Sequence, residues 1–551
     1  MIERQTIIRV ASGQHVRLRL MGQGPAVVLC HESPRSSAAL LPLAGRIADR
    51  FTCVMIDSPG FGLSDPMPQD RPEIAEFAGV VIAVIDALGV APVPVYGTHT
   101  GAAIAIEAAL QAPDKVSAAI LDGYALFTPV EQAELLASYL PPFLPTLDGT
   151  HVAWLWARVR DQFAAFPWNR VSDGARLPFG PPPLAFHQAV VEDFLQAGDA
   201  YRVGYAAAFR YDHLAPLSRA RVPVRLGTRL DDLLHPHMAR AAGQGPMVTT
   251  QDFSADRDVW AADLAALFAE HAGGEALDAD GLLARAQAHQ GARRVLNTAQ
   301  GPVVARTDGA GAPVVLLHDV PGGMADLDHL AQRLAAQRRV VRIDLPGLGA
   351  SRLAAGATPD LATPDLAALA DGTRRALSML DAADAPVLAA GASLPVALAA
   401  TTGPLVALDP WPQVADGLDE ALPDLTPRWD GAHLNAAFWW ARDAEIFKPW
   451  TNRTNAAGRG IGPERDAARI DQRFRATVLA GPTGVALARA LYTEACAPAL
   501  AERGGQVLLY DQDPDLEALT AWAASALGPG AARLVPREAP ALADAVLAAL
   551  A

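Results

Sequence analysis

The sequence predicts an α/β fold in two tandem domains, each built on a mostly parallel sheet flanked by helices. Strand-like and helix-like segments alternate along the chain, the same short motifs occur twice in the same order, and 551 residues exceed what one hydrophobic core usually organises. We expect a first domain at residues 1–275, a linker rich in Ala, Gly and Gln at 276–300, and a second domain at 301–551.

The elements of the first copy follow from its apolar patterning. Residues 5–20 alternate as in edge strands, and residues 26–30 form a fully apolar, buried strand. Amphipathic helices are expected at about 38–49 and 73–89, and further strands at 53–57, 93–96, 222–227 and 247–253. This strand–helix alternation favours a parallel sheet covered on both faces.

Two sets of motifs recur at a constant spacing. His31 and Asp57 each follow a strand, and His318 and Asp344 do so in the second copy, 287 residues later in both cases (318 − 31 and 344 − 57). The segment that begins DGTH at Asp148 recurs as DGAH, 282 residues later (433 − 151). A tandem duplication explains both spacings.

Each copy also carries a long insertion, at about 124–218 and about 411–500, rich in Pro, Trp and helix-like patterns. Insertions of this length are too long for simple loops, so we interpret them as caps over a site. The Asp-Gly-x-His motif of the insertion, with an Arg-Asp pair nine residues after its histidine, is present in both copies. His151 and Arg160 are therefore open to two interpretations, contact with a substrate or a structural role.

One strand leads into an unusual turn, Gly97-Thr98-His99-Thr100-Gly101, followed by an Ala/Ile-rich helix. A strand, a sharp turn with flanking glycines and a helix form a nucleophile elbow, in which the central side chain projects into a pocket. The central residue of that motif is normally serine, and here it is His99. The second copy reads Gly391-Ala392-Ser393-Leu394-Pro395, which keeps a serine but replaces the second glycine.

These motifs resemble the α/β-hydrolase superfamily with a cap domain. The His-x-x-Pro sequence after the third strand, the D-x-P-G-x-G-x-S turns at 57–64 and 344–351, the elbow and the cap position all match, and they cover almost the whole chain twice. The resemblance implies an eight-stranded sheet in each domain and an active site at the carboxyl ends of the strands. It also implies an oxyanion hole from the backbone N–H groups of Glu32, or its neighbour, and Thr100, with Asp319 and Leu394 as counterparts.

The catalytic triad of that superfamily is incomplete in both copies. The acid position falls on Asp231 or Asp232, with Asp122 as an alternative, but the segments after the expected last strands, 253–259 and 535–542, contain no histidine. A serine hydroxyl without a base is a poor nucleophile at neutral pH. We therefore expect the second copy, with Ser393 and Asp319, to be degenerate.

An imidazole at the elbow accepts a proton without a large pKa shift. We hypothesise that His99 and a carboxylate, Glu32 or Asp231, form a general base for water or for an acidic substrate proton. The same group of candidates includes His31 and His235, which we place near the substrate. His235 and His237 without a third ligand make a poor metal site, so no metal is expected.

Composition excludes other classes of partner. The formal net charge is −15 with scattered acidic residues, whereas nucleic-acid binding needs a clustered basic face. Cys30, Cys53 and Cys496 lie far apart without C-x-x-C spacing, which indicates neither a disulfide framework nor zinc. The charged first ten residues and the lack of any run of 18 apolar residues favour a soluble, cytoplasmic protein without a membrane partner.

The sequence thus predicts a cofactor-independent enzyme that acts on a small ester, amide or ketone-like substrate. Two alternatives stay open: a lyase that uses His99 as general base, and a non-catalytic protein that binds a ligand or serves as a scaffold. We expect the second copy to be a structural partner that forms a pseudo-dimer with the first, which allows further homo-oligomerisation.

Overall fold

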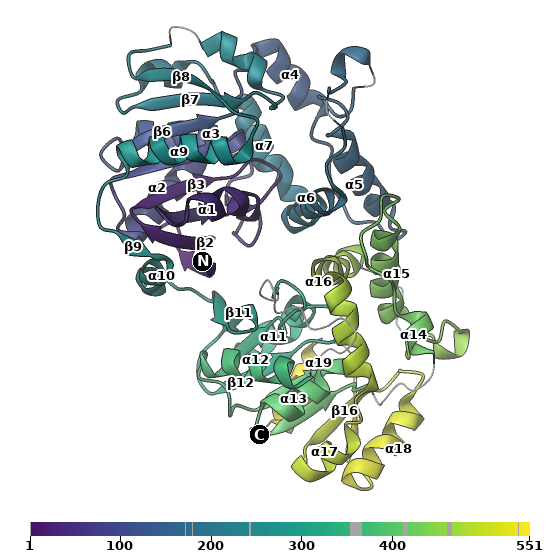
Figure 1. Cartoon of the computed structure of the whole chain (residues 1–551). Helices are drawn as coiled ribbons and strands as arrows, with labels where there is room; N and C mark the ends of the chain where they lie inside the picture. Colours follow the sequence, from purple (N-terminus) through teal and green to yellow (C-terminus); the bar gives the residue numbers. More distant parts are fainter. Residues whose placement is uncertain are drawn as a thin grey trace. The chain divides into compact units, whose positions relative to one another are not determined.

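The computed structural model describes residues 2–170, 172–178, 180–241, 244–352, 366–411, 417–459, 466–537 and 539–550. The chain divides into two compact units (Figure 1). The first contains residues 1–144 and 155–291, and the second contains residues 145–154 and 292–551. A short segment from the insertion of the first unit is therefore grouped with the second.

The sheet of the first unit has the strand order β1-β2-β4-β3-β5-β6-β7-β8. Strands β1 and β2 are antiparallel to their neighbours, and the pairs from β4 to β8 are parallel. The strands are β1 (Arg4–Arg9), β2 (His15–Gly24), β3 (Ala26–Cys30), β4 (Thr52–Ile56), β5 (Val93–Thr98), β6 (Val116–Asp122), β7 (Val224–Arg229) and β8 (Val248–Phe253). The predicted mostly parallel sheet is confirmed, and a ninth strand, β9 (Leu277–Asp278), pairs with β2 outside this order.

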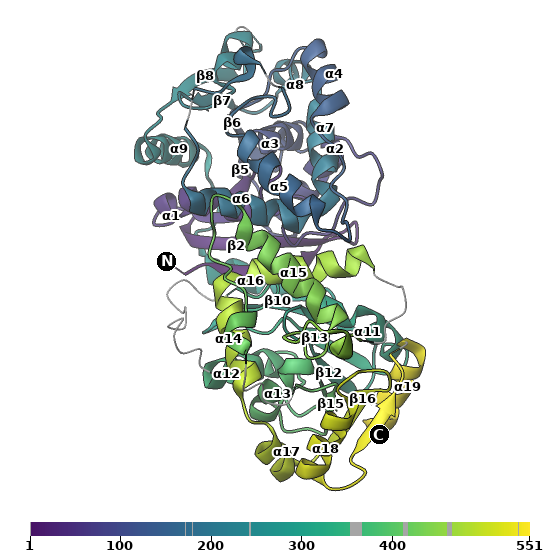
Figure 2. The same cartoon turned by 90° about the vertical axis from the view of Figure 1, so that its right-hand side faces the viewer.

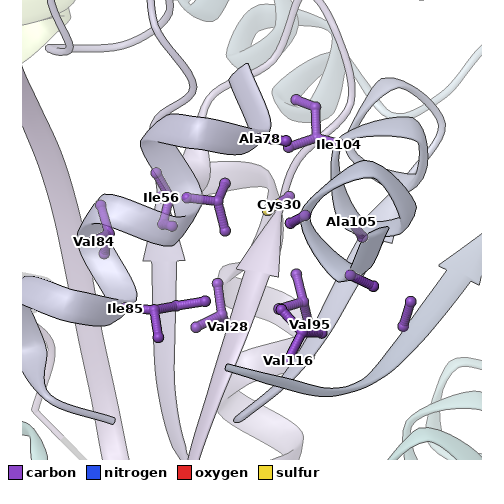
Figure 3. Packing of buried hydrophobic residues seen from close by; sticks show 14 of the residues in the cluster. Val28, Cys30, Ile56, Ala78, Val84, Ile85, Val95, Ile104, Ala105 and Val116 are labelled. Atoms are coloured by element: carbon purple, nitrogen blue, oxygen red, sulfur yellow. The ribbon is translucent and has the colours of Figure 1, made fainter. Parts of the chain in front are cut away.

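Alternate residues of the central strands face two separate layers of helices. Val28 and Cys30 of β3 pack with α2 (Ile74–Leu88), α3 (Thr100–Gln111) and α10 (Ala279–Gln287), as Figure 3 shows for part of this cluster. Val27 and Leu29 pack with α1 (Leu41–Ile47) and α9 (Arg257–His271) on the other face. The strand is fully apolar because both of its faces are buried.

The second unit repeats this strand order as β10-β11-β13-β12-β14-β15-β16-β17. Its strands are β10 (Arg293–Thr298), β11 (Gly301–Asp308), β12 (Pro313–Leu317), β13 (Arg339–Ile343), β14 (Val387–Ala390), β15 (Leu405–Leu408), β16 (Gln506–Tyr510) and β17 (Ala532–Val535). The flanking helices are α11 (Asp328–Leu334), α12 (Leu366–Ser378), α13 (Leu394–Ala400), α18 (Leu516–Leu527) and α19 (Ala539–Ala549). Two sheets with one topology agree with a tandem duplication.

Helical insertions follow the sixth strand of each sheet. The first contains α4 (Pro129–Ser138), α5 (Thr150–Asp161), α6 (Leu184–Ala197), α7 (Tyr201–Arg210) and α8 (Ala215–Arg219). The second contains α14 (Leu418–Ala421), α15 (Ala432–Ile446), α16 (Ala467–Thr493) and α17 (Ala497–Arg503). Helices α15 and α16 lie side by side (Figure 2).

The segment expected as a linker, 276–300, is largely ordered structure of the two units. Within it, β9 (Leu277–Asp278) pairs with β2, and buried apolar residues of α10 pack against the first sheet. Apolar side chains at Leu282 and Ala286 explain this packing, which the Ala-rich composition concealed. The first unit consequently extends to residue 291.

The part of the chain that the structure describes contains no helix long and apolar enough to cross a membrane.

Candidate active site

The turn after β5 has the backbone geometry of an elbow. His99 has φ 48° and ψ −109°, a left-handed conformation that strains any residue with a Cβ. A Cβ at Gly97 would lie 2.0 Å from the carbonyl oxygen of Gly101, and one at Gly101 would lie 2.3 Å from that of Cys30. The two glycines are therefore required by close backbone contacts on both sides of His99.

The side chain of His99 forms a pair with Asp232, which follows β7. His99 Nε2 lies 2.9 Å from Asp232 Oδ2 and 3.1 Å from Oδ1. Because a carboxylate only accepts hydrogen bonds, Nε2 carries the proton and Nδ1 is the basic nitrogen of the neutral ring. The structure gives Nδ1 no hydrogen-bond partner among the described residues, and the side chain is 29% exposed.

The surroundings tune both members of this pair. Burial acts to lower the pKa of the His99 imidazole, but the carboxylates of Asp232 and Glu32 outweigh it, so the pKa is raised above 6.5. Burial acts to raise the pKa of Asp232, but His99 and Arg229 hold that pKa well below its ordinary value. The carboxylate therefore stays ionised and stabilises an imidazolium.

A buried group of side chains supports Asp232, and sequence reasoning missed most of it. Arg229 Nη2 lies 3.3 Å from Asp232 Oδ2, and Nη1 lies 3.4 Å from Asp122 Oδ2. The hydroxyl of Tyr96 and the indole N–H of Trp260 each donate to Asp122 Oδ2 at 2.9 Å. Asp122 thus holds Arg229 beside the His99–Asp232 pair. The only hint of this contact in the sequence was that Arg229 lies three residues before Asp232.

Of the two aspartates that the sequence offered for the acid position, Asp232 and not Asp231 lies beside His99. Asp231 lies in the cavity wall, but its carboxylate forms ion pairs with Arg257 at 2.8 Å and with Arg229 at 3.4 Å. Successive residues after the strand point in different directions, so only Asp232 reaches His99. The neighbouring His235 instead lies 3.0 Å from Asp252 and does not line the cavity.

His99 opens onto a cavity of about 310 Å³ between the sheet and the helical insertion. Most of the wall is apolar or aromatic, and seven aromatic rings contribute to it: Phe127, Tyr139, Phe163, Phe166, Phe186, Tyr205 and Phe209. The rings of Phe127 and Phe166 are stacked, with centroids 6.4 Å apart. Such a wall suits an apolar ligand, with polar groups confined to the elbow end.

The polar part of the wall includes Glu32 and Arg35. Arg35 is 8% exposed, and its Nε donates to Asp193 Oδ2 at 2.7 Å. Glu32 Oε1 lies 3.8 Å from Arg35 Nη1, beyond hydrogen-bond distance, and its side chain is 25% exposed. The Glu32 carboxylate is consequently the least neutralised charge in the wall.

Backbone N–H groups also reach this end of the cavity. Thr100 begins α3, and Ser33 and Glu32 belong to the loop after β3. All three residues line the cavity, and the structure gives their N–H groups no acceptor among the described residues. They are the available donors for an oxyanion.

Two more of the predicted substrate contacts, His31 and Arg160, lie outside the cavity wall. His31 is 1% exposed; its Nδ1 donates to the carbonyl of Glu32, and its Nε2 accepts from the Ser58 N–H. His318 makes the matching contacts in the second unit, so this histidine braces two loops. Arg160 is exposed and outside the cavity wall.

His151 belongs to the segment 145–154 that is grouped with the second unit, where its Nε2 lies 3.1 Å from Asp471 Oδ1. Its Nδ1 accepts from the N–H of Thr146, five residues earlier, and His433 accepts likewise from Arg428. The motif of the insertion therefore shapes the start of a helix in both copies. This favours the structural interpretation of His151.

The elbow of the second unit corrects the predicted position of its serine. Cys30 pairs with Gly97 and Leu317 with Ala389, so the counterpart of His99 is Gly391, with φ 56°. Ser393 lies two residues beyond the turn, fully buried, and its hydroxyl donates to the Ala390 carbonyl at 2.8 Å. Ser393 is therefore not at the position of a nucleophile.

Asp319 occupies the space above that turn. Its Oδ1 accepts from the N–H groups of Val320 at 2.7 Å and Ala392 at 2.8 Å. A Cβ at Gly391 would lie 2.0 Å from the same oxygen. Ala392 and not Leu394 is thus the donor after the turn, and both donors are already satisfied by a carboxylate.

The acid position of the second unit is also occupied differently. The strand register makes Asp513, after β16, the counterpart of Asp232, after β7. In the first unit Asp122 pairs with Gly227, five residues before Asp232, and in the second Leu408 pairs with Leu508, five residues before Asp513. Asp513 Oδ2 lies 3.1 Å from Arg459 Nη1. The second unit therefore has a carboxylate at this position, and its described residues give that carboxylate no hydrogen bond to an imidazole.

The described residues contain no group of three or more His, Cys, Asp or Glu side chains that could hold a metal ion.

Comparison with known proteins identifies several similar sequences. Residues 25–181 match the family described as alpha/beta hydrolase fold. The chain is 31% identical over 121 residues to 2-(acetamidomethylene)succinate hydrolase of Mesorhizobium japonicum, across 22% of this chain and 42% of that protein. It is 32% identical over 116 residues to haloalkane dehalogenase 2 of Mycobacterium tuberculosis, across 21% and 40% respectively. The chain thus spans about two fifths of the length of these curated relatives.

Among solved structures, an epoxide hydrolase from Vigna radiata is 17% identical, with a TM-score of 0.38, and the match covers 49% of this chain and 97% of that one.

Proposed function

We propose that the first unit, of which residues 25–181 match the family described as alpha/beta hydrolase fold, is a cofactor-independent hydrolase of a small ester, amide or ketone-like substrate, with His99 as general base. The observation that carries this proposal is the distance of 2.9 Å between His99 Nε2 and Asp232 at the floor of a cavity of about 310 Å³. An ionised carboxylate on one ring nitrogen leaves the other nitrogen basic, as proton transfer requires.

In the proposed reaction, water enters between His99 Nδ1 and the substrate carbonyl. Nδ1 takes one proton from water while the oxygen forms a bond to the carbonyl carbon, and the carbonyl electron pair moves to its oxygen. When the tetrahedral species collapses, the bond to the leaving group breaks and the imidazolium returns the proton to the leaving alcohol or amine, or to the enolate carbon of a ketone-like substrate. Asp232 holds the ring through Nε2–H and stabilises its charged form throughout.

The developing oxyanion is assigned to the N–H groups of Thr100 and Ser33. The second unit supports this choice, because Asp319 places a carboxylate oxygen on Ala392 and Val320, the counterparts of these two residues. The second donor that we propose is thus the N–H of Ser33, the neighbour of Glu32, which the resemblance to the superfamily allowed as an alternative to Glu32 itself. Preorganised donors of this kind commonly supply about 10²–10³ in rate.

We assign the chemistry to the first unit alone and a structural role to the second. Gly391 offers no side chain at the elbow, and Asp319 keeps a negative charge where an oxyanion would form. Two anionic oxygens cannot share one pair of donors without strong repulsion. The second insertion therefore has no catalytic site to cover.

A lyase reaction is the second candidate, favoured by the lack of a nucleophilic side chain at the elbow. The same His99–Asp232 pair would then remove a proton from a hydroxyl or an activated carbon of the substrate. Hydrolysis in ¹⁸O-water labels the acid product, whereas carbon–carbon cleavage without water leaves it unlabelled.

The decisive experiment is a panel of aromatic and aliphatic esters, amides, lactones and β-diketones assayed with the full-length chain. We expect His99→Ala to lower kcat/KM about 10²–10⁴-fold, the usual loss when a general base is removed. The matched control is His235→Ala, because His235 also pairs with an aspartate, at 3.0 Å, but lies outside the cavity wall. Full turnover by His99→Ala would refute the proposal, and inactivity of the wild type on the whole panel would favour a ligand-binding role.

A further inference from the structure

The positive charge of the cavity wall is paired, whereas one of its negative charges is not fully paired. This difference bears on the class of substrate. Arg35 is the only Lys or Arg among the described lining residues. Its guanidinium is committed, because it donates to the carboxylate of Asp193 and lies 5.0 Å from the centroid of the Phe186 ring. A substrate carboxylate would find no free guanidinium or ammonium group in this wall.

The second histidine of the wall is not a cation either. Burial lowers the pKa of His213 to about 4, so its ring is neutral at pH 7. Its Nε2 lies 3.0 Å from the carbonyl oxygen of Ala208, to which it donates. Neutral His213 therefore completes the aromatic part of the wall.

Glu32 places a negative charge in the cavity wall that no close cation neutralises fully. Among the described residues its ion-pair contact is with Arg35, at 3.8 Å, and Arg35 is already bound by Asp193. The other wall carboxylates, Asp231 and Asp232, each have closer ion pairs, at 2.8 Å and 2.9 Å. The Glu32 carboxylate also raises the pKa of His99, which places its field at the reacting end of the cavity.

We propose that Glu32 sets the specificity of this cavity, so that it admits uncharged aromatic compounds and rejects those that carry a carboxylate. The proposal rests on the proposed function for the reaction but concerns binding. The stacked pair of Phe127 and Phe166 receives a flat ring, and the substrate presents its reactive carbonyl to His99. An anion near Glu32 meets repulsion in a medium where water screens poorly.

The test compares two ligands of the same shape and different charge, naphthalene-1-carboxamide and 1-naphthoate, by calorimetric titration at pH 7.5. The protein is full-length His99→Ala, which prevents turnover of the amide. We expect the amide to bind at least about tenfold more tightly than the carboxylate, a ratio that one repulsive contact readily produces. Adding Glu32→Gln should reduce the ratio of the two affinities to about threefold or less, mainly because 1-naphthoate then binds more tightly.

Glu134→Gln is the matched control, because Glu134 is an exposed glutamate paired with Arg170 outside the cavity wall. It should leave the ratio unchanged. A second readout is the pKa of His99 in Glu32→Gln with the histidine intact, measured by NMR, which should fall relative to wild type because one nearby negative charge is lost.

The proposal is overturned if 1-naphthoate binds as tightly as the amide, if the amide does not bind at millimolar concentration, or if Glu32→Gln leaves the ratio unchanged. These outcomes do not depend on turnover. The proposed hydrolase activity fails independently, if the protein with intact His99 turns over its substrate no faster than His99→Ala.

Discussion

The two elbows of this chain share a backbone turn and differ in what fills it. In the first unit the turn residue is His99, with φ 48°, and its side chain reaches Asp232. In the second it is Gly391, with φ 56°, and the carboxylate of Asp319 lies where a side chain would begin. The comparison teaches that the sheet maintains the turn without any catalytic side chain.

Features outside the elbow are retained in both units. Asp57 accepts from the N–H groups of Ser37 and Leu63, and Asp344 accepts from those of Met324 and Ala350. The histidines after the third strand brace the same loops. Since these contacts persist where the elbow side chain is absent, we interpret them as contacts that maintain the fold.

The strongest test copies the second elbow into the first. We expect His99→Gly to lower kcat/KM about 10²–10⁴-fold because the base is removed. Its free energy of unfolding should change by less than about 1 kcal/mol, since glycine releases backbone strain while the contact with Asp232 is lost. Turnover assays and urea denaturation measure the two effects. A large loss of stability would mean that the first elbow, unlike the second, needs its side chain to fold.

The next test removes the carboxylate beside the imidazole. Asp232→Asn should lower kcat/KM about 10²–10⁴-fold through loss of orientation and charge stabilisation. In the wild type, kcat/KM should rise with pH and level off above an inflection higher than 6.5, because the active ring is neutral and its pKa is raised. In Asp232→Asn this inflection should move to lower pH.

The same pair should also affect stability with a definite sign. A raised folded-state pKa of His99 contributes stability that is present below about 6.5 and is lost as pH rises through the folded-state value. Thermal denaturation of the wild type between pH 5 and 9 should show this loss, and Asp232→Asn should not. If Asp232→Asn lost stability with rising pH as the wild type does, Asp232 would not be the cause of the raised pKa of His99.

A smaller effect is expected in the second unit. Asp319→Gly should lower the free energy of unfolding by about 2–4 kcal/mol, because the N–H groups of Val320 and Ala392 lose their acceptor. Acetate replaces the missing group and should restore stability, whereas acetamide should not. The control Asp424→Gly also removes an acceptor of a backbone N–H, that of Thr426, but at an exposed site, and acetate should not affect it. Absence of acetate rescue would indicate that Asp319 acts through other contacts.

The smallest effect is expected at Ser393. Ser393→Ala should leave turnover unchanged and lower stability by about 1 kcal/mol, the usual contribution of one hydrogen bond. A fluorophosphonate probe should not label this serine, because its side chain is buried and bonded to a backbone carbonyl. Labelling detected by mass spectrometry at Ser393 would restore it as a nucleophile.

The fold was accessible from the sequence because alternation and apolar runs report directly on burial. Residues 26–30 and 93–96 read as buried strands, and they lie side by side at the centre of the sheet. The elbow was recognisable from Gly97 and Gly101, since close backbone contacts impose both glycines: Gly97 lies against Gly101, and Gly101 lies against Cys30 of the neighbouring strand. Such steric constraints leave a mark on the sequence.

The second elbow was misaligned because the spacing between copies changes along the chain. The difference in residue number between matching positions is 287 at the third strand. It rises to 292 at the elbow (389 − 97) and then falls to 286 at the next strand (408 − 122). The shortening of the intervening helix from 12 residues in α3 to 7 in α13 accounts for most of that fall. A motif alone could not reveal that Ser393 lies beyond the turn.

The partners of His99 were harder to infer than His99 itself. Asp231 and Asp232 are adjacent and identical in type, and only the path of the chain after β7 decides which one meets the ring. Arg229, Trp260 and Tyr96 converge on Asp122 from three elements far apart in sequence. Long-range convergence of this kind has no local signature.

The carboxylate of Asp319 leaves no room for a side chain at the second elbow. Any side chain restored at position 391 would meet this oxygen at 2.0 Å, and removing the carboxylate first leaves two N–H donors unpaired. Each single substitution toward an active elbow is therefore destabilising by itself. A side chain at position 391 therefore requires both changes together, which makes this elbow harder to alter than one without the Asp319 contact.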